Sequence, residues 1–201
     1  NGVLDLLTGK VSPSGKLADT ISEDITDNPS TANFGNPDNN IYAEDIYVGY
    51  RYFESFAKDK VVYPFGFGLS YTTFAMKVVD FSWDGDKVVA SVEVTNMGAA
   101  AGKEVVQLYV SAPQGKIGKA ARVLCGFAKT KELTSGESEV VTITCGKYYL
   151  ASYDDSGLSG YKSAYVLENG TYTFYAGSDV RCEMVAGTFE LAETIVVDQL
   201  T

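Results

Sequence analysis

The sequence predicts a mainly β fold in which residues 75–197 form a two-sheet antiparallel sandwich. Apolar and polar residues alternate in short runs, as in DKVVASVEVTN (86–96), which is typical of strands that bury one face. Turn sequences such as DGD (84–86) and ENG (168–170) separate these runs. Hydrophobic residues make up 45% of the 201 residues, which is enough for a core. The pattern is typical of immunoglobulin-like and fibronectin type III-like sandwiches.

The first elements follow a different pattern. Four apolar side chains fall on one face of a predicted helix end: Val3, Leu4, Leu6 and Leu7. Gly9 suits its C-terminal cap, and VSPSGKLADTI then predicts a turn and a short strand that ends near Ile21. Residues 22–40 are rich in Asp, Asn, Ser, Pro and Gly. They predict a long surface loop with few groups able to fix it.

Residues 41–74 are rich in residues that favour extended structure, and we expect no helix there. The stretch YPFGFGLSYTTF (63–74) holds five aromatic residues and two glycines. We expect Gly66 and Gly68 to let backbone approach backbone where a Cβ atom would clash. We expect the aromatic rings to bury large areas, as in a clamp between domains.

Regular strands follow from Ala75. The predicted strands are 76–83, 86–96, 103–112, 121–133, 138–145, 164–168, 170–178 and 187–197. Asn169-Gly170 predicts first of all a hairpin turn, although Asn169 also matches a glycosylation acceptor. The first 74 residues fit no complete domain, so we expect this chain to be part of a larger protein.

Several motifs resemble a known family. DLLTGKVSPSGKLADTI, GYRYFE, YPFGFGLSYTTF and TNMGAAAGKEVVQLYVSAP occur in this order, followed by LCGFAKTKELTSGES and NGTYTFYAG. Together they resemble the C-terminal region of glycoside hydrolase family 3 β-glucosidases. One departure is Leu17-Ala18, where the family usually has Leu-Pro.

The resemblance implies a division of the chain. Residues 1–74 would be the C-terminal remnant of an α/β sandwich domain plus an aromatic linker, and residues 75–197 a fibronectin type III-like domain. The parent protein would be a retaining β-glucosidase that hydrolyses terminal β-linked glucosides. Its aspartate nucleophile and glutamate acid/base would lie outside this chain, which therefore holds no catalytic residue. The partners would be the barrel and α/β sandwich domains of the same polypeptide, in either order along the chain, and a homo-oligomer stays open.

We predict that the aromatic linker packs these domains together. The predicted interdomain residues are Tyr50, Arg51, Tyr52, Phe53, Phe65, Phe67, Leu69, Tyr71 and Phe74. Arg51 would pair with a carboxylate or stack on a ring. One alternative is a carbohydrate-binding module, which would expose several rings in one plane on a single sheet face. Another is a stand-alone structural or interaction domain, which would lack large uncovered apolar patches.

Other kinds of site find little support. The chain has no histidine, which excludes a Ser-His-Asp triad and imidazole metal sites. Adjacent carboxylates at 44–45 and 154–155 are better explained as solvated surface groups than as a catalytic pair. Asp84-Gly-Asp86 is better explained by a turn than by a calcium site. We expect no cofactor.

Charge and cysteine content restrict the partners. The formal charge is −10 without a basic cluster, which argues against nucleic acid, and no run approaches 18 apolar residues, which argues against membrane insertion. The three cysteines, Cys125, Cys145 and Cys182, are expected to be buried free thiols, with one disulfide left open as an alternative. Free thiols favour the cytoplasm over secretion.

Overall fold

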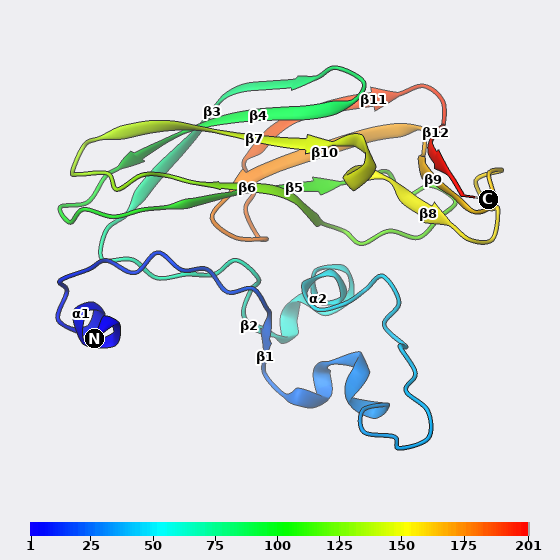
Figure 1. Ribbon diagram of the computed structural model, residues 1–201, viewed down its shortest axis with the longest axis horizontal. Helices are drawn as coiled ribbons and strands as arrows, with labels where there is room; N and C mark the ends of the chain where they lie inside the picture. Colours follow the sequence, from blue (N-terminus) through cyan, green and yellow to red (C-terminus); the bar gives the residue numbers. More distant parts are fainter. Residues whose placement is uncertain (201) are drawn as a thin grey trace.

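The computed structural model describes residues 1–200 and contains the predicted antiparallel sandwich (Figure 1). One sheet has the order β3-β4-β7, formed by β3 (Phe74–Trp83), β4 (Lys87–Asn96) and β7 (Ser138–Gly146). The other has the order β11-β10-β5-β6, formed by β5 (Val105–Ser111), β6 (Val123–Lys129), β10 (Gly170–Gly177) and β11 (Val185–Leu191). All neighbours in both sheets are antiparallel. The predicted fold class is confirmed.

A third, smaller sheet was not expected. Its order is β12-β9-β8, formed by β12 (Ile195–Gln199), β9 (Ala164–Leu167) and β8 (Ser152–Asp154). The prediction of one strand at 187–197 is wrong, because the chain bends at 192–194 and continues in another sheet. The hairpin predicted at Asn169-Gly170 is also wrong, because β9 and β10 lie in different sheets and these residues form a corner.

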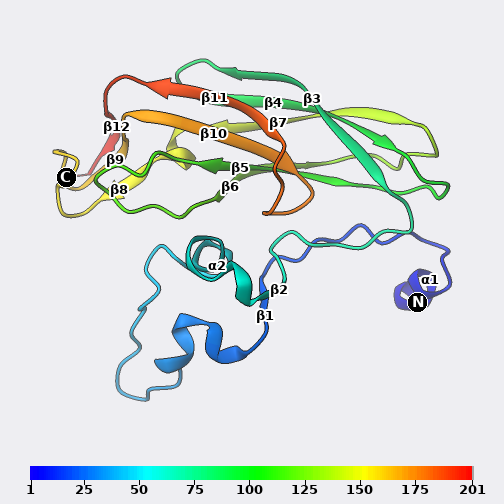
Figure 2. The ribbon, with the colours of Figure 1, turned by 180° about the vertical axis from the view of Figure 1, so that it is seen from behind.

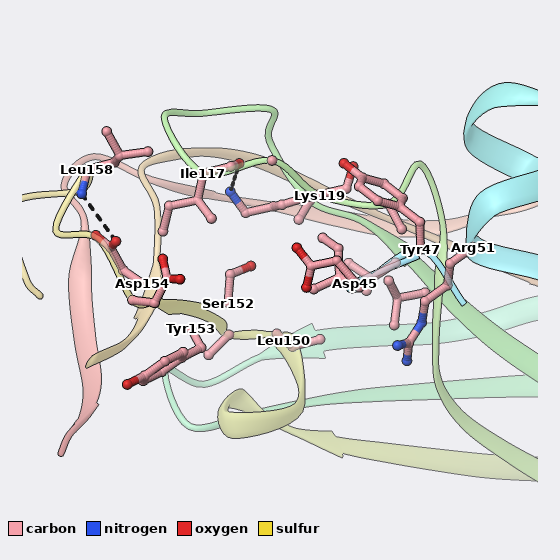
Figure 3. Close-up of a pocket in the computed structure, with 18 of the residues that line it drawn as sticks. Asp45, Tyr47, Arg51, Ile117, Lys119, Leu150, Ser152, Tyr153, Asp154 and Leu158 are labelled. Carbon is pink, nitrogen blue, oxygen red and sulfur yellow. Dashed lines mark hydrogen bonds between the residues drawn. The ribbon is translucent and has the colours of Figure 1, made fainter. Parts of the chain in front are cut away.

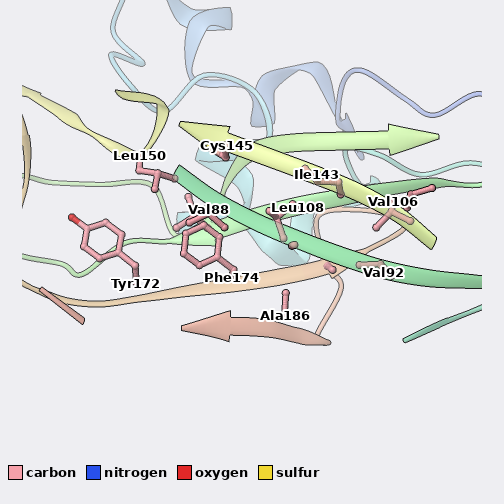
Figure 4. Packing of buried hydrophobic residues seen from close by; sticks show 14 of the residues in the cluster. Val88, Val92, Val106, Leu108, Ile143, Cys145, Leu150, Tyr172, Phe174 and Ala186 are labelled. Atoms are coloured by element: carbon pink, nitrogen blue, oxygen red, sulfur yellow. The ribbon is translucent and has the colours of Figure 1, made fainter. Parts of the chain in front are cut away.

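The core lies between the two large sheets (Figure 4). On β4 every second side chain is fully buried: Val88, Ala90, Val92 and Val94. Leu108 of β5 and Phe174 of β10 face them from the other sheet. Each such side chain contributes roughly 1.5–3 kcal/mol through the apolar area that it removes from water. The alternation predicted from the sequence therefore places the core correctly.

The turn between β3 and β4 forms as the sequence predicts. The Asp84 side chain accepts hydrogen bonds from the backbone N–H groups of Asp86 and Lys87, both at 2.9 Å. These bonds lower the pKa of the Asp84 carboxyl group. A hairpin turn is therefore a sufficient reason for the DGD sequence at this position.

The strand β5 is buried on both faces. Val106, Leu108 and Val110 point into the core, yet Gln107 and Tyr109 on the opposite face are also at most 3% exposed. Figures 1 and 2 show the reason: the N-terminal segment runs along this outer face of the sandwich. The sandwich is therefore covered by a layer that its own strands do not supply.

The N-terminal elements partly match the predictions. The helix end is confirmed as α1 (Gly2–Leu7), and Gly9 takes the left-handed φ of 73° after it. The short strand β1 (Ile21–Ser22) begins where we expected it to end, and it pairs with β2 (Val61–Tyr63). Neither α1 nor any other helix in residues 1–200 has the length and hydropathy needed to cross a bilayer.

The loop at 22–40 has more internal fixing groups than predicted. It contains two 3-10 helices, η1 (Ile25–Asp27) and η2 (Pro29–Ala32). Asp24 caps the first by accepting hydrogen bonds from the backbone N–H and the hydroxyl of Thr26, at 2.8 and 2.7 Å. Asp, Asn and Thr side chains thus bond to the local backbone, which composition alone does not distinguish from an open loop.

The prediction of no helix at 41–74 is wrong. Residues Tyr50–Phe56 form α2, and the 3-10 helix η3 (Lys58–Lys60) follows. Gly49 precedes α2 with a φ of 57°, which turns the chain into the helix. Helical spacing of three residues brings Tyr50 and Phe53 to one face, where Phe53 is buried and Tyr50 is partly buried. Tertiary packing here overrides the extended preference of aromatic residues.

Candidate interdomain interface

Tyr50 attaches α2 to the sandwich. Its ring stacks on Phe65 with centroids 4.4 Å apart and planes at 30°, and it meets the ring of Tyr109 edge-on at 6.4 Å. Its hydroxyl oxygen accepts a hydrogen bond of 2.9 Å from the backbone N–H of Leu124 on β6. Such aromatic pairs add about 0.5–1.5 kcal/mol beyond the area that they bury. One side chain therefore contacts the linker, β5 and β6 together.

Gln107 provides a polar connection beside these rings. Its amide nitrogen donates to the carbonyl oxygens of Gly66 and Ser178, at 3.3 and 2.5 Å. Its amide oxygen accepts from the hydroxyl of Tyr109 at 2.5 Å. Burial raises the pKa of Tyr109 above its ordinary value, so this hydroxyl keeps its proton and can donate at neutral pH. All donors and acceptors of this buried group are used, which makes the contact specific.

Two glycines allow the linker to lie against its neighbours. A Cβ atom on Gly66 would lie 2.4 Å from Gln107 Oε1, and one on Gly68 would lie 2.5 Å from the carbonyl oxygen of Gly15. Beside them, the N–H of Leu17 donates to the carbonyl oxygen of Phe67, and the N–H of Gly66 donates to that of Leu17, both at 2.8 Å. The close backbone approach predicted for these glycines is confirmed.

On another side of α2, an ion pair joins this helix to Arg181. Glu54 is only 3% exposed, and its Oε1 accepts a hydrogen bond of 3.1 Å from Arg181 Nε. Arg181 also donates from Nη2 to the carbonyl oxygen of Lys58 at 2.7 Å, and Lys58 Nζ lies 3.6 Å from Glu54 Oε2. Since a buried carboxylate is costly without a partner, these two cations permit Glu54 to face the sandwich.

The structure brings some of the predicted interdomain residues together. Tyr50, Phe53 and Phe65 lie on the sandwich side, and the Arg51 guanidinium carbon lies 5.9 Å from the centre of the Tyr50 ring. This separation lies within the range of a cation–π contact. The ring of Tyr52 packs edge-on against Phe53 at 5.4 Å.

The other predicted residues lie apart from this group. Phe67 packs against Tyr63 at 5.0 Å, and Phe74 begins β3 and contacts the sandwich core. Leu69 is 70% exposed, and Tyr71 is half exposed although its hydroxyl donates to the carbonyl oxygen of Leu6 at 2.7 Å. These two side chains face away from the sandwich contacts described above.

Sequence reasoning missed four residues on the sandwich side of the linker: Glu54, Gln107, Tyr109 and Arg181. The sequence does contain a signal for Gln107, which is a polar residue in the middle of the apolar run VVQLYV. A polar side chain flanked by buried positions on both sides indicates a specific buried partner. Nothing local in the sequence distinguishes Glu54 or Arg181 from surface charges.

The outer side of the N-terminal segment is apolar and uncovered. Sixteen large hydrophobic side chains are exposed among residues 1–74, against thirteen among the much longer stretch 75–200. The helix α1 buries none of its residues, and Phe34 is 87% exposed. A concentration of exposed apolar side chains of this kind indicates a contact surface. The segment therefore has one side packed on the sandwich and one side open.

Family comparisons agree with this two-part arrangement. Residues 1–71 match the model of the glycosyl hydrolase family 3 C-terminal domain, and residues 104–180 match that of the fibronectin type III-like domain. The chain is similar to the C-terminal region of glycoside hydrolase family 3 proteins. It pairs part of the family's C-terminal domain with a fibronectin type III-like domain, as the sequence motifs predicted.

Individual relatives extend this result. The chain is 56% identical over 199 residues to the β-glucosidase of Ruminococcus albus, covering 99% of this chain and 21% of that protein. A β-glucosidase structure from Paenibacillus barengoltzii superposes with a TM-score of 0.96 at 53% identity, covering 99% of this chain and 23% of that one. β-Glucosidase 3B from Thermotoga neapolitana, in complex with α-D-glucose, gives 0.86 at 39% identity, covering 98% and 27%. The chain thus spans about a quarter or less of these relatives.

Proposed function

We propose that the chain is a non-catalytic scaffolding region of a retaining β-glucosidase that hydrolyses terminal β-linked glucosides. In this proposal residues 1–74 complete the α/β sandwich domain and form the linker, and residues 75–197 are the fibronectin type III-like domain. The linker would hold these two domains, and the barrel, in a fixed arrangement. The names of the relatives and the short share of their length that the chain covers support this proposal.

One observation carries the scaffolding role: the N-terminal segment has two different sides. Tyr50, Phe65 and Gly66 are packed on the sandwich, while the helix α1, Phe34 and Leu69 expose apolar side chains. A segment that joins two bodies needs both surfaces, because each body must remove apolar area from water. If the segment only covered the sandwich, the exposed apolar side chains on its other side would not stabilise anything.

The carboxylates of the chain support a non-catalytic role. Asp154 accepts hydrogen bonds from the backbone N–H groups of Gly157, Leu158 and Ser159, at 2.7, 3.1 and 2.7 Å. With the hydroxyl of Ser159, which has the largest effect, these bonds lower the pKa of Asp154. A glycosidase acid needs the opposite shift, toward a raised pKa. Asp154 organises a loop and is unsuited to protonate a leaving group.

The linker rings do not support the carbohydrate-module alternative. That alternative requires open ring faces in one plane, but Tyr50 and Phe65 cover each other and Phe53 is 1% exposed. The stand-alone domain is equally disfavoured, since residues 1–74 carry the open apolar side that such a domain would lack.

A chimeric enzyme tests the scaffolding proposal. The chain would replace the matching segment of the Ruminococcus albus β-glucosidase, and hydrolysis of an aryl β-glucoside and thermal unfolding would be measured. We expect an active chimera, whereas the isolated chain should give no turnover. Leu69→Ser should lower the melting temperature of the chimera by several degrees, since burial of one leucine contributes roughly 1.5–3 kcal/mol.

The same substitution in the isolated chain is the control. Because Leu69 is 70% exposed there, Leu69→Ser should leave the melting temperature of the isolated chain almost unchanged. Equal shifts in chain and chimera would show that Leu69 does not contact another domain. Turnover by the isolated chain would show that it holds the catalytic groups, against the proposal.

A further inference from the structure

We propose that a cleft between the linker and β8 is an accessory binding site for a β-linked glucose oligosaccharide. The inference goes beyond scaffolding, and it rests on the proposed function only for the choice of sugar. The cleft has a volume of about 580 Å³, within the range of roughly 300–1,000 Å³ that small-molecule sites occupy. Figure 3 shows its walls, with Asp45, Tyr47 and Arg51 on the linker side and Ser152 and Tyr153 on the β8 side.

Two tyrosine residues contribute to the walls of the cleft. Tyr149, in the 3-10 helix η4 (Lys147–Leu150), is 74% exposed, and Tyr153 of β8 is 42% exposed. Tyr153 packs against Tyr165 of β9 at 5.1 Å, while Tyr149 meets the ring of Tyr148 at 88°. The axial C–H groups of a β-linked glucose unit form an apolar face that stacks on such rings. In Figure 3 the Tyr153 ring points away from the interior of the cleft, so Tyr149 is the exposed ring available to a sugar.

The cleft also contains polar groups that the fold does not use. The guanidinium of Arg51 lies beside the Tyr50 ring, and its buried Nε atom has no hydrogen-bond partner within the described residues. The Asp45 carboxylate and the Ser152 hydroxyl point toward the interior of the cleft, and no hydrogen bond joins them to another side chain shown (Figure 3). A carboxylate, a guanidinium and a hydroxyl are groups that can bind adjacent sugar hydroxyls.

Other charged residues in the same walls are already engaged. Lys119 is paired with the buried carboxylate of Glu168, and Asp154 is surrounded by its own loop. The remaining charged groups of the lining are two acids, Asp45 and Asp155, and one base, Arg51. This arrangement has no excess of positive charge, so it fits a neutral polyhydroxyl ligand better than a phosphate or another anion.

Titration of the 201-residue chain with cellotetraose and with laminaritetraose tests this site, using calorimetry and NMR. We expect saturable binding of at least one of the two, with shifts confined to residues around the cleft. Tyr149→Ala should weaken binding about tenfold, through the lost stacking face. Asp45→Asn should weaken it about as much, and asparagine tolerates the left-handed φ of 49° at this position.

Tyr161→Ala is the matched control. Tyr161 is 43% exposed in the neighbouring loop but does not line the cleft, so this variant should bind as the original chain does. Melting temperatures of all variants establish that each is folded. Absence of saturable binding, or binding that neither cleft variant weakens, overturns the proposal.

The chimera described above separates this result from the scaffolding proposal. An active chimera whose Leu69→Ser variant is destabilised supports scaffolding, whether or not the cleft binds sugar. If the isolated chain binds the oligosaccharide but the chimera with an inactivated barrel does not, another part of the polypeptide fills the cleft. That outcome overturns the accessory site in the complete protein and leaves scaffolding supported.

Discussion

The side-chain amide of Gln107, in the middle of β5, donates a hydrogen bond to the main-chain carbonyl oxygen of Gly66 in the linker. The two residues are 41 positions apart in the sequence and meet in the buried interior. A strand of the sandwich core thus also carries the polar contact that holds the aromatic linker. Because the same strand serves both, loss of this contact should reduce the stability of linker and sandwich together.

Gly66→Ala should destabilise the chain strongly. The residue has a φ of 85°, and a Cβ atom would lie 2.4–2.9 Å from Gln107 and the Asp179 backbone. Left-handed strain and overpacking together should lower the free energy of unfolding by about 3 kcal/mol. Urea denaturation followed by circular dichroism measures this change.

Gly35→Ala provides the matched control. Gly35 has a similar φ of 81°, but nothing lies within 4 Å of the position of its Cβ atom. This variant should therefore show only the backbone strain, about 1 kcal/mol. Equal losses in the two variants would show that the contact with Gln107 does not limit the position of Gly66.

Gln107→Leu should cost about 2–3 kcal/mol of unfolding free energy. Leucine keeps most of the buried volume but leaves the Tyr109 hydroxyl and the Gly66 carbonyl without their partner. The companion variant Tyr109→Phe removes the hydroxyl that the leucine would leave without a hydrogen-bond partner. In a double-mutant cycle, Tyr109→Phe should therefore cost less in the Gln107→Leu background than alone. Strict additivity of the two losses would contradict the shared hydrogen bond.

Asp154→Asn should change how stability depends on pH. The folded-state pKa of Asp154 is lowered below the ordinary value of 3.8, first by the hydrogen bond from the Ser159 hydroxyl. A lowered folded-state pKa means that the ionised carboxylate stabilises the fold above pH 3.8 and that this contribution is lost as the pH falls toward the folded-state value. The variant should thus be less stable at pH 7, and its melting temperature should approach that of the original chain in acid.

Asp155→Asn is the control for this pH experiment. Asp155 is the exposed neighbour of Asp154, so its substitution should leave the difference in melting temperature between pH 7 and pH 3 nearly unchanged. If Asp154→Asn were as stable as the original chain at pH 7, the loop hydrogen bonds would not stabilise the fold.

Local patterns in the sequence were sufficient for much of the sandwich. The alternation in β4 predicted which side chains fill the core, and Trp83 ends β3 at the predicted turn. The motifs also predicted the family. They were insufficient for β8, which is only three residues long, and for the separation of β11 from β12. Short strands leave too few alternating positions to be recognised, and which sheet a strand joins depends on distant partners.

The candidate interface, like the sandwich, could be predicted only in part from the sequence. The aromatic residues of the linker were identified because their density is unusual, and the glycines because close backbone contacts require them. The helix α2 was missed because isolated helices of seven residues are marginal, and this one is held by tertiary contacts such as those of Tyr50 with β5 and β6. Glu54 and Arg181 were missed because the local sequence does not distinguish a charged residue with a buried partner from a charged surface residue.

The sequence by itself determined most of the long strands, the core face of each and the aromatic character of the linker, and its motifs predicted the likeness to family 3. All of these depend on residues that are close in sequence, where period and composition carry the information. The tertiary structure alone decided which side of the linker is buried, the pairing of Gln107 with Gly66, and the cleft in which Asp45 faces Ser152. These depend on segments that meet only after folding, and their contacts are set by the shape of the assembled sandwich.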